Sequence, residues 1–195
     1  MNVNQAREHV KISQVIDPQI YTDKDTGKSY MLFGNGNGGA SIVELGEDMM
    51  SLVPGTMKNI EGAVNFREAI MVNKIDGVYH FTWSCDDTGS PNYHVRYGIS
   101  DNLYGPILHK GVLLQRDETE DILGTAHHEI FYHPERDEYY IIYHRFWTPL
   151  WQFKAGGAGN HREVCIERLE YKDGLFQPVK PTHKGLLEKV PATTN

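Results

Sequence analysis

One local plan recurs three times along this chain. Each copy opens with an ionisable residue before a short apolar strand, turns through charged residues, and returns in a strand rich in aromatic side chains. The copies span 16–33, 68–83 and 127–144. A β unit that recurs every ~40–60 residues is typical of a propeller blade, whereas the strands of a sandwich turn every ~8–12 residues. The repeat therefore predicts an all-β fold of the propeller type.

The repeat also predicts the domain organisation. We expect a lead-in at 1–15, propeller blades over 16–185 with repeats starting near 16, 67 and 124, and a tail at 186–195. Three blades are fewer than the four or more that usually close a propeller. Either the ring is incomplete or blades come from elsewhere, so we expect a homo-oligomer or a partner that supplies the missing blades.

Charge and composition argue against several classes of partner. The 19 Lys and Arg are outnumbered by 26 Asp and Glu, which gives a formal net charge of −7. Nucleic acid and anionic membranes are therefore not expected as partners. No apolar stretch reaches the ~18–20 residues of a membrane span, and the first residues lack the apolar segment of a signal peptide. The two cysteines, Cys85 and Cys165, are too few for a disulfide scaffold.

Two motifs point to chemistry that their surroundings do not support. Residues 34–39 match the glycine pattern of a dinucleotide-binding loop, but a strand-like segment follows where that motif needs a helix. We interpret them as a glycine-rich turn. His128 and His133 suggest a zinc-protease motif, but they lack its i, i+4 spacing. Because they are an odd number of residues apart in a predicted strand, they point to opposite faces and cannot share a metal.

The ionisable residues that open the three repeats are the strongest candidates for chemistry. The innermost strands of successive blades line a common axis, so Asp17, Glu68 and His127 are expected to meet at one end of it. Converging carboxylates move each other's pKa values apart, as acid–base catalysis requires. In a purely structural alternative, Asp17 caps a turn before Pro18. Glu68 then pairs with Arg67, and His127 bonds to the backbone.

Other residues are candidates for contact with a sugar. Arg162 precedes a short strand and offers a forked donor suited to sugar hydroxyls, although a single arginine is commonly just a surface residue. Tryptophans stack on sugar rings, and the chain has three, Trp83, Trp147 and Trp151. Trp83 is the preferred candidate, but it lies within a strand and is alternatively part of the core.

Four local matches make the sequence similar to glycoside hydrolase family 43. They are the I-D-P opening at 16–30, the glutamate-led blade at 66–84, the outer strands and Gly-Pro turn at 92–106, and the G-T-A-H-H and Y-H-R elements at 124–145. The resemblance implies a five-bladed β-propeller that is truncated here to its C-terminal three blades. It also implies an arabinofuranosidase- or xylosidase-like enzyme for plant glycans, secreted or periplasmic in its full-length form.

The resemblance also implies roles for the site residues. Glu68 would be the general acid and Asp17 the residue that orients it and tunes its pKa. His127 matches an axial histidine that contacts substrate and is associated with a structural calcium ion on the propeller axis, so it is also a candidate metal ligand. Arg162 would reach the substrate pocket. No cofactor is required, and Ala126 stands where the family often has Gly.

One part of the expected mechanism is missing from the sequence pattern. The family inverts the anomeric centre, so a general base must activate water on the opposite face of the sugar. No segment before residue 16 matches the blade that carries this base, and we expect the base to come from outside this chain. The alternative is a non-catalytic sugar-binding or vestigial propeller fragment. Fructan-cleaving propeller hydrolases are a nearer alternative, but their motif reads R-D-P where this chain has Ile16.

Overall fold

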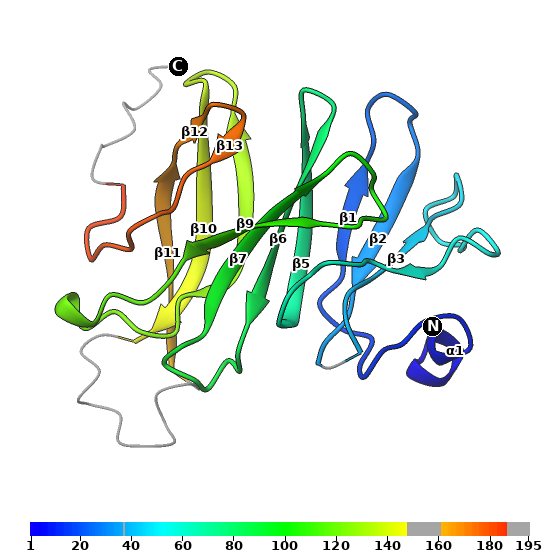
Figure 1. The fold of residues 1–195 in the computed structure, drawn as a ribbon, viewed down its shortest axis with the longest axis horizontal. Helices are drawn as coiled ribbons and strands as arrows, with labels where there is room; N and C mark the ends of the chain where they lie inside the picture. The colour runs from blue at the N-terminus through cyan, green and yellow to red at the C-terminus, as the bar shows by residue number, and fades with distance from the viewer. Residues whose placement is uncertain (37, 148–160, 187–195) are drawn as a thin grey trace, which may run out of the picture.

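The computed structural model describes residues 1–36, 38–147 and 161–186. It confirms the predicted all-β class, because these residues form three main antiparallel sheets with one short α-helix and a single turn of 3-10 helix. Figure 1 shows the three sheets side by side, in chain order from the N-terminal to the C-terminal sheet, like neighbouring propeller blades. No helix in this described part is long and apolar enough to cross a membrane.

The first sheet has four strands in chain order: β1 (Gln19–Thr22), β2 (Ser29–Phe33), β3 (Ser41–Glu44) and β4 (Lys58–Asn59). The N-terminal segment packs against it through a short helix, α1 (Val3–Arg7), which Asn2 caps. The apolar side chains of this segment form a small core with the sheet, made of Ala6, Val10, Ile12, Phe33 and Val43. The segment expected as a lead-in is therefore packed onto the first blade.

The second sheet is the centre of the molecule. Its strands are β5 (Phe66–Ile75), β6 (Val78–Cys85), β7 (His94–Ser100) and β8 (Leu108–Leu114). Side chains alternate between the two faces of a strand. Ile70 and Val72 on β5 belong to the core shared with the first sheet, whereas Met71 belongs to the core shared with the third. Both faces of this blade are therefore buried between its neighbours.

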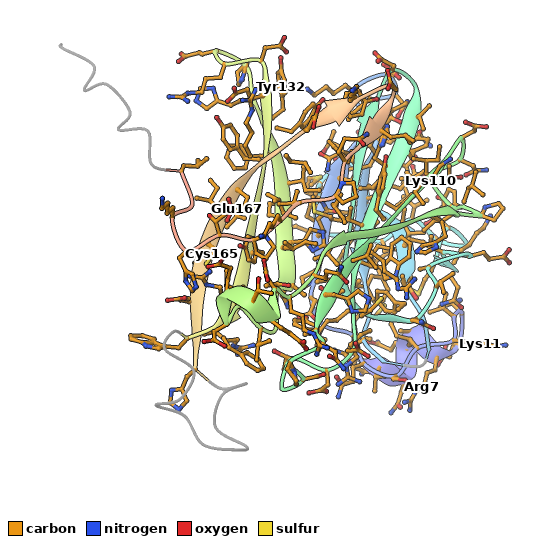
Figure 2. All side chains as sticks on the ribbon, turned by 60° about the vertical axis from the view of Figure 1, so that its left-hand side comes forward. Arg7, Lys11, Lys110, Tyr132, Cys165 and Glu167 are labelled. Atoms are coloured by element: carbon orange, nitrogen blue, oxygen red, sulfur yellow. The ribbon has the colours of Figure 1, made fainter. Side chains whose placement is uncertain are left out.

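The third sheet has three strands in the order β11-β10-β9, with bounds β9 (Ala126–His133), β10 (Glu138–Phe146) and β11 (Arg162–Leu169). The 3-10 turn at Glu118–Glu120 precedes it, and a small hairpin of β12 (Tyr171–Lys172) and β13 (Leu175–Phe176) follows. Figure 2 shows Cys165 and Glu167 on β11, the outer strand of this sheet. Val164 on β11 is 78% exposed, so this end of the described fold has an open apolar surface.

The innermost strands of the three sheets lie next to one another. β1 contacts β5, and β5 contacts β9, so the N-terminal ends of these strands are brought together although they are far apart in the sequence. This is the arrangement of propeller blades around an axis. It places the openings of the three sequence repeats at one end of that axis.

Candidate active site

The backbone bends in the same way where each inner strand begins. Asp17, Ala69 and His127 have left-handed φ values of 54°, 52° and 50°, a conformation that costs energy for a residue with a side chain. At the second position the bend coincides with irregular pairing between Glu68 and Met71 of β5 and their partners on β6. The repeat therefore encodes a common strained turn, and this turn directs a polar side chain from each blade toward the axis.

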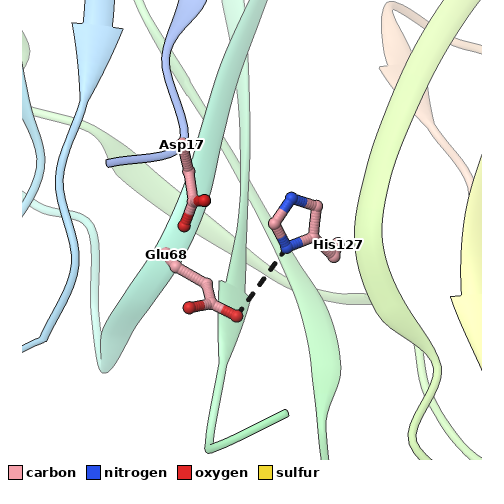
Figure 3. A group of neighbouring side chains, drawn as sticks. All are labelled: Asp17, Glu68 and His127. Carbon is pink, nitrogen blue, oxygen red and sulfur yellow. Dashed lines mark ion pairs between the residues drawn. The ribbon is translucent and has the colours of Figure 1, made fainter. Parts of the chain in front are cut away.

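Three ionisable side chains from three blades converge at this point. Asp17, Glu68 and His127 each offer one nitrogen or oxygen atom, and these atoms all lie within 4.8 Å of one another (Figure 3). Nδ1 of His127 lies 3.8 Å from Oε1 of Glu68. The convergence expected from the repeat is present in the structure.

Hydrogen bonds hold the Glu68 carboxylate at both of its oxygens. The Tyr93 hydroxyl donates to Oε1, and Nδ2 of Asn35 donates to Oε2. Glu68 is only 8% exposed, and Tyr93 has no exposed surface. Arg67, the partner of Glu68 in the structural alternative, instead forms an ion pair with Asp87 at 2.8 Å. The local structure therefore keeps the Glu68 side chain in one orientation within the cluster.

The pKa values of the two carboxyl groups move in opposite directions. Burial is the largest influence on Asp17 and, together with the charge of Glu68, raises the Asp17 pKa against the effects of His127 and Asn35. Burial also acts to raise the pKa of Glu68. There, however, the contact with His127, the hydrogen bond from Tyr93 and the charges of His127 and Arg67 prevail, so the Glu68 pKa is lowered. The unliganded site therefore favours an ionised Glu68.

His127 faces this carboxylate. The Glu68 carboxylate 3.8 Å away raises the pKa of the imidazole, with burial opposing and the charge of Asp17 assisting. Its backbone N–H donates to Oγ of Ser84 at 3.0 Å, which ties the third blade to the second. The ring also stacks on His144, at a centroid distance of 5.8 Å. His144 stays neutral near pH 7, because burial lowers its pKa to about 4.

The predicted sugar contacts have different outcomes. Arg162 is exposed at the start of β11, and its guanidinium donates to the Thr88 hydroxyl at 2.6 Å. Its charge acts on His127 and His144, which places it beside the cluster. The prediction that Trp83 contacts substrate is wrong, because its ring has no exposed surface and its Nε1 donates to the Val64 carbonyl within the core.

Of the other two tryptophans, Trp147 is 46% exposed just after β10. Trp151 lies outside the described residues. Neither residue is therefore assigned as a sugar contact.

Sequence reasoning missed three residues of the site, Asn35, Tyr93 and His144. Asn35 lies in the glycine-rich segment 34–39, which we interpreted only as a turn. Tyr93 precedes β7, within a match to the family motif. Tyr93 stacks on His144 with centroids 5.6 Å apart, and His144 belongs to the Y-H-R element on β10. Tyr93 and His144 therefore lie within the motif segments 92–106 and 124–145, but nothing in the threefold repeat indicates that they belong to the site.

The three clustered side chains alone do not complete the coordination of a calcium ion. Ca²⁺ takes six to eight oxygen ligands, water among them. The cluster supplies two carboxylates and one imidazole, and both oxygens of Glu68 already accept hydrogen bonds. The remaining ligands of the expected axial calcium would therefore be water molecules or groups outside the described residues. The reaction proposed for this site uses no metal.

A cavity of about 390 Å³ opens beside the cluster. Asp17, His127 and His144 line it, together with Glu129 of β9 and the exposed Val164. Oδ2 of Asp17 is buried and has no hydrogen-bond partner among the described residues. The cavity therefore brings together an unsatisfied acceptor, an imidazole with a raised pKa and apolar surface.

Propeller blades with a carboxyl pair at the axial end of their inner strands define a β-propeller of the kind that carries a glycosidase site. Comparison with known proteins makes the assignment specific. The chain belongs to glycosyl hydrolases family 43, because the model of that family matches residues 3–176.

Individual relatives agree with this assignment. The β-D-galactofuranosidase XynD of Aspergillus niger is 32% identical over 176 residues, which cover 89% of this chain and 48% of that protein. An α-L-arabinofuranosidase from Clostridium thermocellum is 28% identical, with a TM-score of 0.66, over 92% of this chain and 58% of that one. The chain spans about half the length of the fungal relative.

A third relative supports the fold alone. An arabinoxylan arabinofuranohydrolase from Bacillus subtilis, solved in complex with cellotetraose, has a TM-score of 0.73 at 24% identity. The match covers 90% of this chain and 39% of that one. The described residues therefore correspond to part of a longer chain in each of these relatives.

Proposed function

We propose that this chain carries the acid part of a glycosidase site for arabinose- or xylose-containing glycans. The observation that carries the proposal is the convergence of Asp17 and Glu68 at one end of the axis in a member of family 43. The relatives support the substrate class. One is named for galactofuranosides and one for arabinofuranosides, and a further relative from Bacteroides ovatus is named a xylosidase/arabinosidase.

In the proposed reaction, Glu68 protonates the glycosidic oxygen as the bond between that oxygen and the anomeric carbon breaks. The transition state has oxocarbenium character, and water attacks the anomeric carbon from the opposite face of the sugar. The attacking water gives its proton to a base outside the described residues. Arg162 and the unpartnered Oδ2 of Asp17 are the groups we expect to contact the sugar.

The spacing of the carboxyl groups supports a tuning role for Asp17. In inverting glycosidases the acid and the base are ~6.5–9.5 Å apart, which leaves room for the attacking water. Asp17 and Glu68 have carboxylate oxygens within 4.8 Å of each other, which is too close for that water. Asp17 therefore suits a residue that orients the acid and moves its pKa, and not the general base.

The proton that Glu68 delivers is held by His127 in the unliganded site, because the Glu68 pKa is lowered and the His127 pKa is raised. A bound sugar displaces water from the cluster. Loss of water destabilises an ion pair relative to the neutral pair, since burial penalises charge. The proton therefore moves from His127 to Glu68 when substrate covers the site, and from Glu68 to the leaving oxygen.

A non-catalytic sugar-binding role is the second candidate. The observation that favours it is the composition of the cluster, whose two carboxyl groups lie too close together to serve as the acid and the base of an inverting enzyme. Glu129 also lines the cavity, but it lies two positions beyond His127 on β9 and outside the cluster. A chain of this kind would bind pentose glycans without turnover.

Azide distinguishes the two functions, because it is a nucleophile that needs no base. The chain is assayed with aryl α-L-arabinofuranosides and aryl β-D-xylosides with and without azide, and Glu68→Gln is the control. We expect azide-dependent aryl release with formation of the glycosyl azide, and loss of both in Glu68→Gln on phenyl glycosides, whose leaving group needs a proton. Sugar binding without azide-dependent release supports the non-catalytic role. Absence of both binding and release contradicts both functions.

A further inference from the structure

The glycine-rich segment 34–39 has a position that the proposed function does not yet use. Its Asn35 is only 4% exposed. Nδ2 of Asn35 donates to Oε2 of Glu68, and the same side chain also acts to lower the pKa of Asp17. A side-chain amide is a donor that suits a carboxylate oxygen and carries no charge of its own.

The backbone on either side of Asn35 is fixed to both carboxyl-bearing segments. The N–H of Gly34 donates to the carbonyl of Ile16 at 3.0 Å, and the N–H of Gly36 donates to the carbonyl of Arg67 at 2.7 Å. Ile16 and Arg67 immediately precede Asp17 and Glu68 in the sequence. The loop therefore bridges the first and second blades at the point where each presents its carboxyl group.

Glycine is required for this bridge. Gly34 has a φ of 133°, and a Cβ there would lie 2.8 Å from the carbonyl oxygen of Gly39. Gly36 has a φ of 78°, in the left-handed region that favours glycine. The match to a nucleotide-binding pattern therefore has a different physical origin, which is the close approach of this loop to two neighbouring strands.

We propose that Asn35 is a positioning residue that holds Glu68 beside Asp17, through its side-chain amide and through the backbone of its loop. This inference rests on the proposed function. The amide donates to the Glu68 carboxylate, and this contact offsets the repulsion from the neighbouring Asp17. Because an amide does not titrate, the link persists whether the proton lies on His127 or on Glu68.

Asn59 shows what a purely structural asparagine does in the same sheet. Its Nδ2 donates to the backbone carbonyls of Lys11 and Ala40, and its Oδ1 accepts from the N–H of Lys11. These contacts tie the N-terminal segment to the sheet and involve no carboxylate. Asn59→Ala is therefore a matched control, because it weakens packing around the same loop without touching the coupled pair.

The first test follows the Asn35 side-chain amide by NMR in the full chain and needs no turnover. We expect its ¹H and ¹⁵N resonances to shift in Glu68→Gln, which removes the charged acceptor, and also in Asp17→Asn, which removes a charge beside that acceptor. They should stay in place in Asn59→Ala. Resonances that respond to only one carboxyl substitution, or to neither, overturn the coupling.

The second test is kinetic and uses Asn35→Leu and Asn35→Ala, so that the proposal does not depend on one variant folding. With azide present, we expect kcat on a phenyl glycoside to fall about 10- to 100-fold, with KM unchanged, because the acid is misplaced. The loss should be smaller on a dinitrophenyl glycoside, which needs no acid. Unchanged kcat in a folded variant overturns the positioning role. If the wild type shows no turnover, the proposed function fails while the NMR test still decides the coupling.

Discussion

Nδ1 of His127 lies 3.8 Å from Oε1 of Glu68, so a histidine of the third blade balances a carboxylate of the second. This relationship explains why the Glu68 pKa is lowered although burial alone would raise it. In most general acids the environment raises the pKa. Here the contact with His127 lowers it, and our proposal is that the imidazole holds the proton until substrate covers the site.

Replacement of the imidazole tests this relationship. In His127→Gln we expect the pKa of Glu68 to rise, because the contact with the imidazole and the influence of its charge are lost while burial remains. The measurement is a ¹³C NMR titration of the Glu68 carboxyl group. His94→Gln is the control, since His94 faces Asp86 instead. A Glu68 pKa that falls or stays constant in His127→Gln contradicts the ion-pair account.

Acid stability depends on a buried histidine away from the site. His80 has no exposed surface, its Nδ1 lies 2.6 Å from the Tyr97 hydroxyl, and burial lowers its pKa from 6.5 to about 4. The unfolded chain therefore binds a proton at His80 before the folded chain does. Its stabilising contribution is complete above pH 6.5 and is lost as the pH falls from 6.5 through 4.

The expected loss from this single group is about 3 kcal/mol at pH 4. Urea unfolding at pH 7 and pH 4 measures it, and His80→Phe should show a smaller difference between the two pH values than the wild type. His9→Gln, at an exposed position, should behave like the wild type. Equal pH dependence in His80→Phe and the wild type would show that His80 is not the responsible group.

The tight packing of the glycine-rich loop gives a stability prediction. A Cβ on Gly38 would lie 2.4 Å from Cα of Ile12, so the backbone must move to accept it. Gly38→Ala should lower the free energy of unfolding by about 1–3 kcal/mol and shift the Asn35 amide resonances. Gly89→Ala has only an ordinary contact at 3.4 Å and should change stability by less than about 0.5 kcal/mol. Equal stabilities for both variants would contradict the packing.

The sequence predicts the fold and the three converging side chains well, because both follow from one repeat. Equivalent positions in successive blades face one axis, so the repeat alone predicts that Asp17, Glu68 and His127 meet there. Asn35 was not predictable, since its place depends on backbone hydrogen bonds from Gly34 and Gly36 to segments of other strands. The direction of the Glu68 pKa shift was not predictable either, because it depends on contacts made only after folding.

Trp83 shows an error that the sequence itself contained. Phe81, Trp83 and Cys85 alternate along β6, and all three lie in the core shared by the first two sheets. Apolar residues at every second position of a strand indicate one buried face. Trp83 could stack on a sugar only if it lay on the other face of β6. The alternation of apolar residues places it on the buried face.

The central claim is that Glu68 acts as the acid. The most direct test is how the rate loss in Glu68→Gln depends on the leaving group of the substrate. Wild type and Glu68→Gln are compared, with azide present, on phenyl and dinitrophenyl glycosides of the same pentose. Protonation by a general acid contributes about 10²–10⁴-fold. We predict a loss of that size for Glu68→Gln on the phenyl glycoside and little loss on the dinitrophenyl glycoside, whose leaving group departs without a proton. Equal losses on the two substrates, or no loss on either, would contradict the assignment of Glu68.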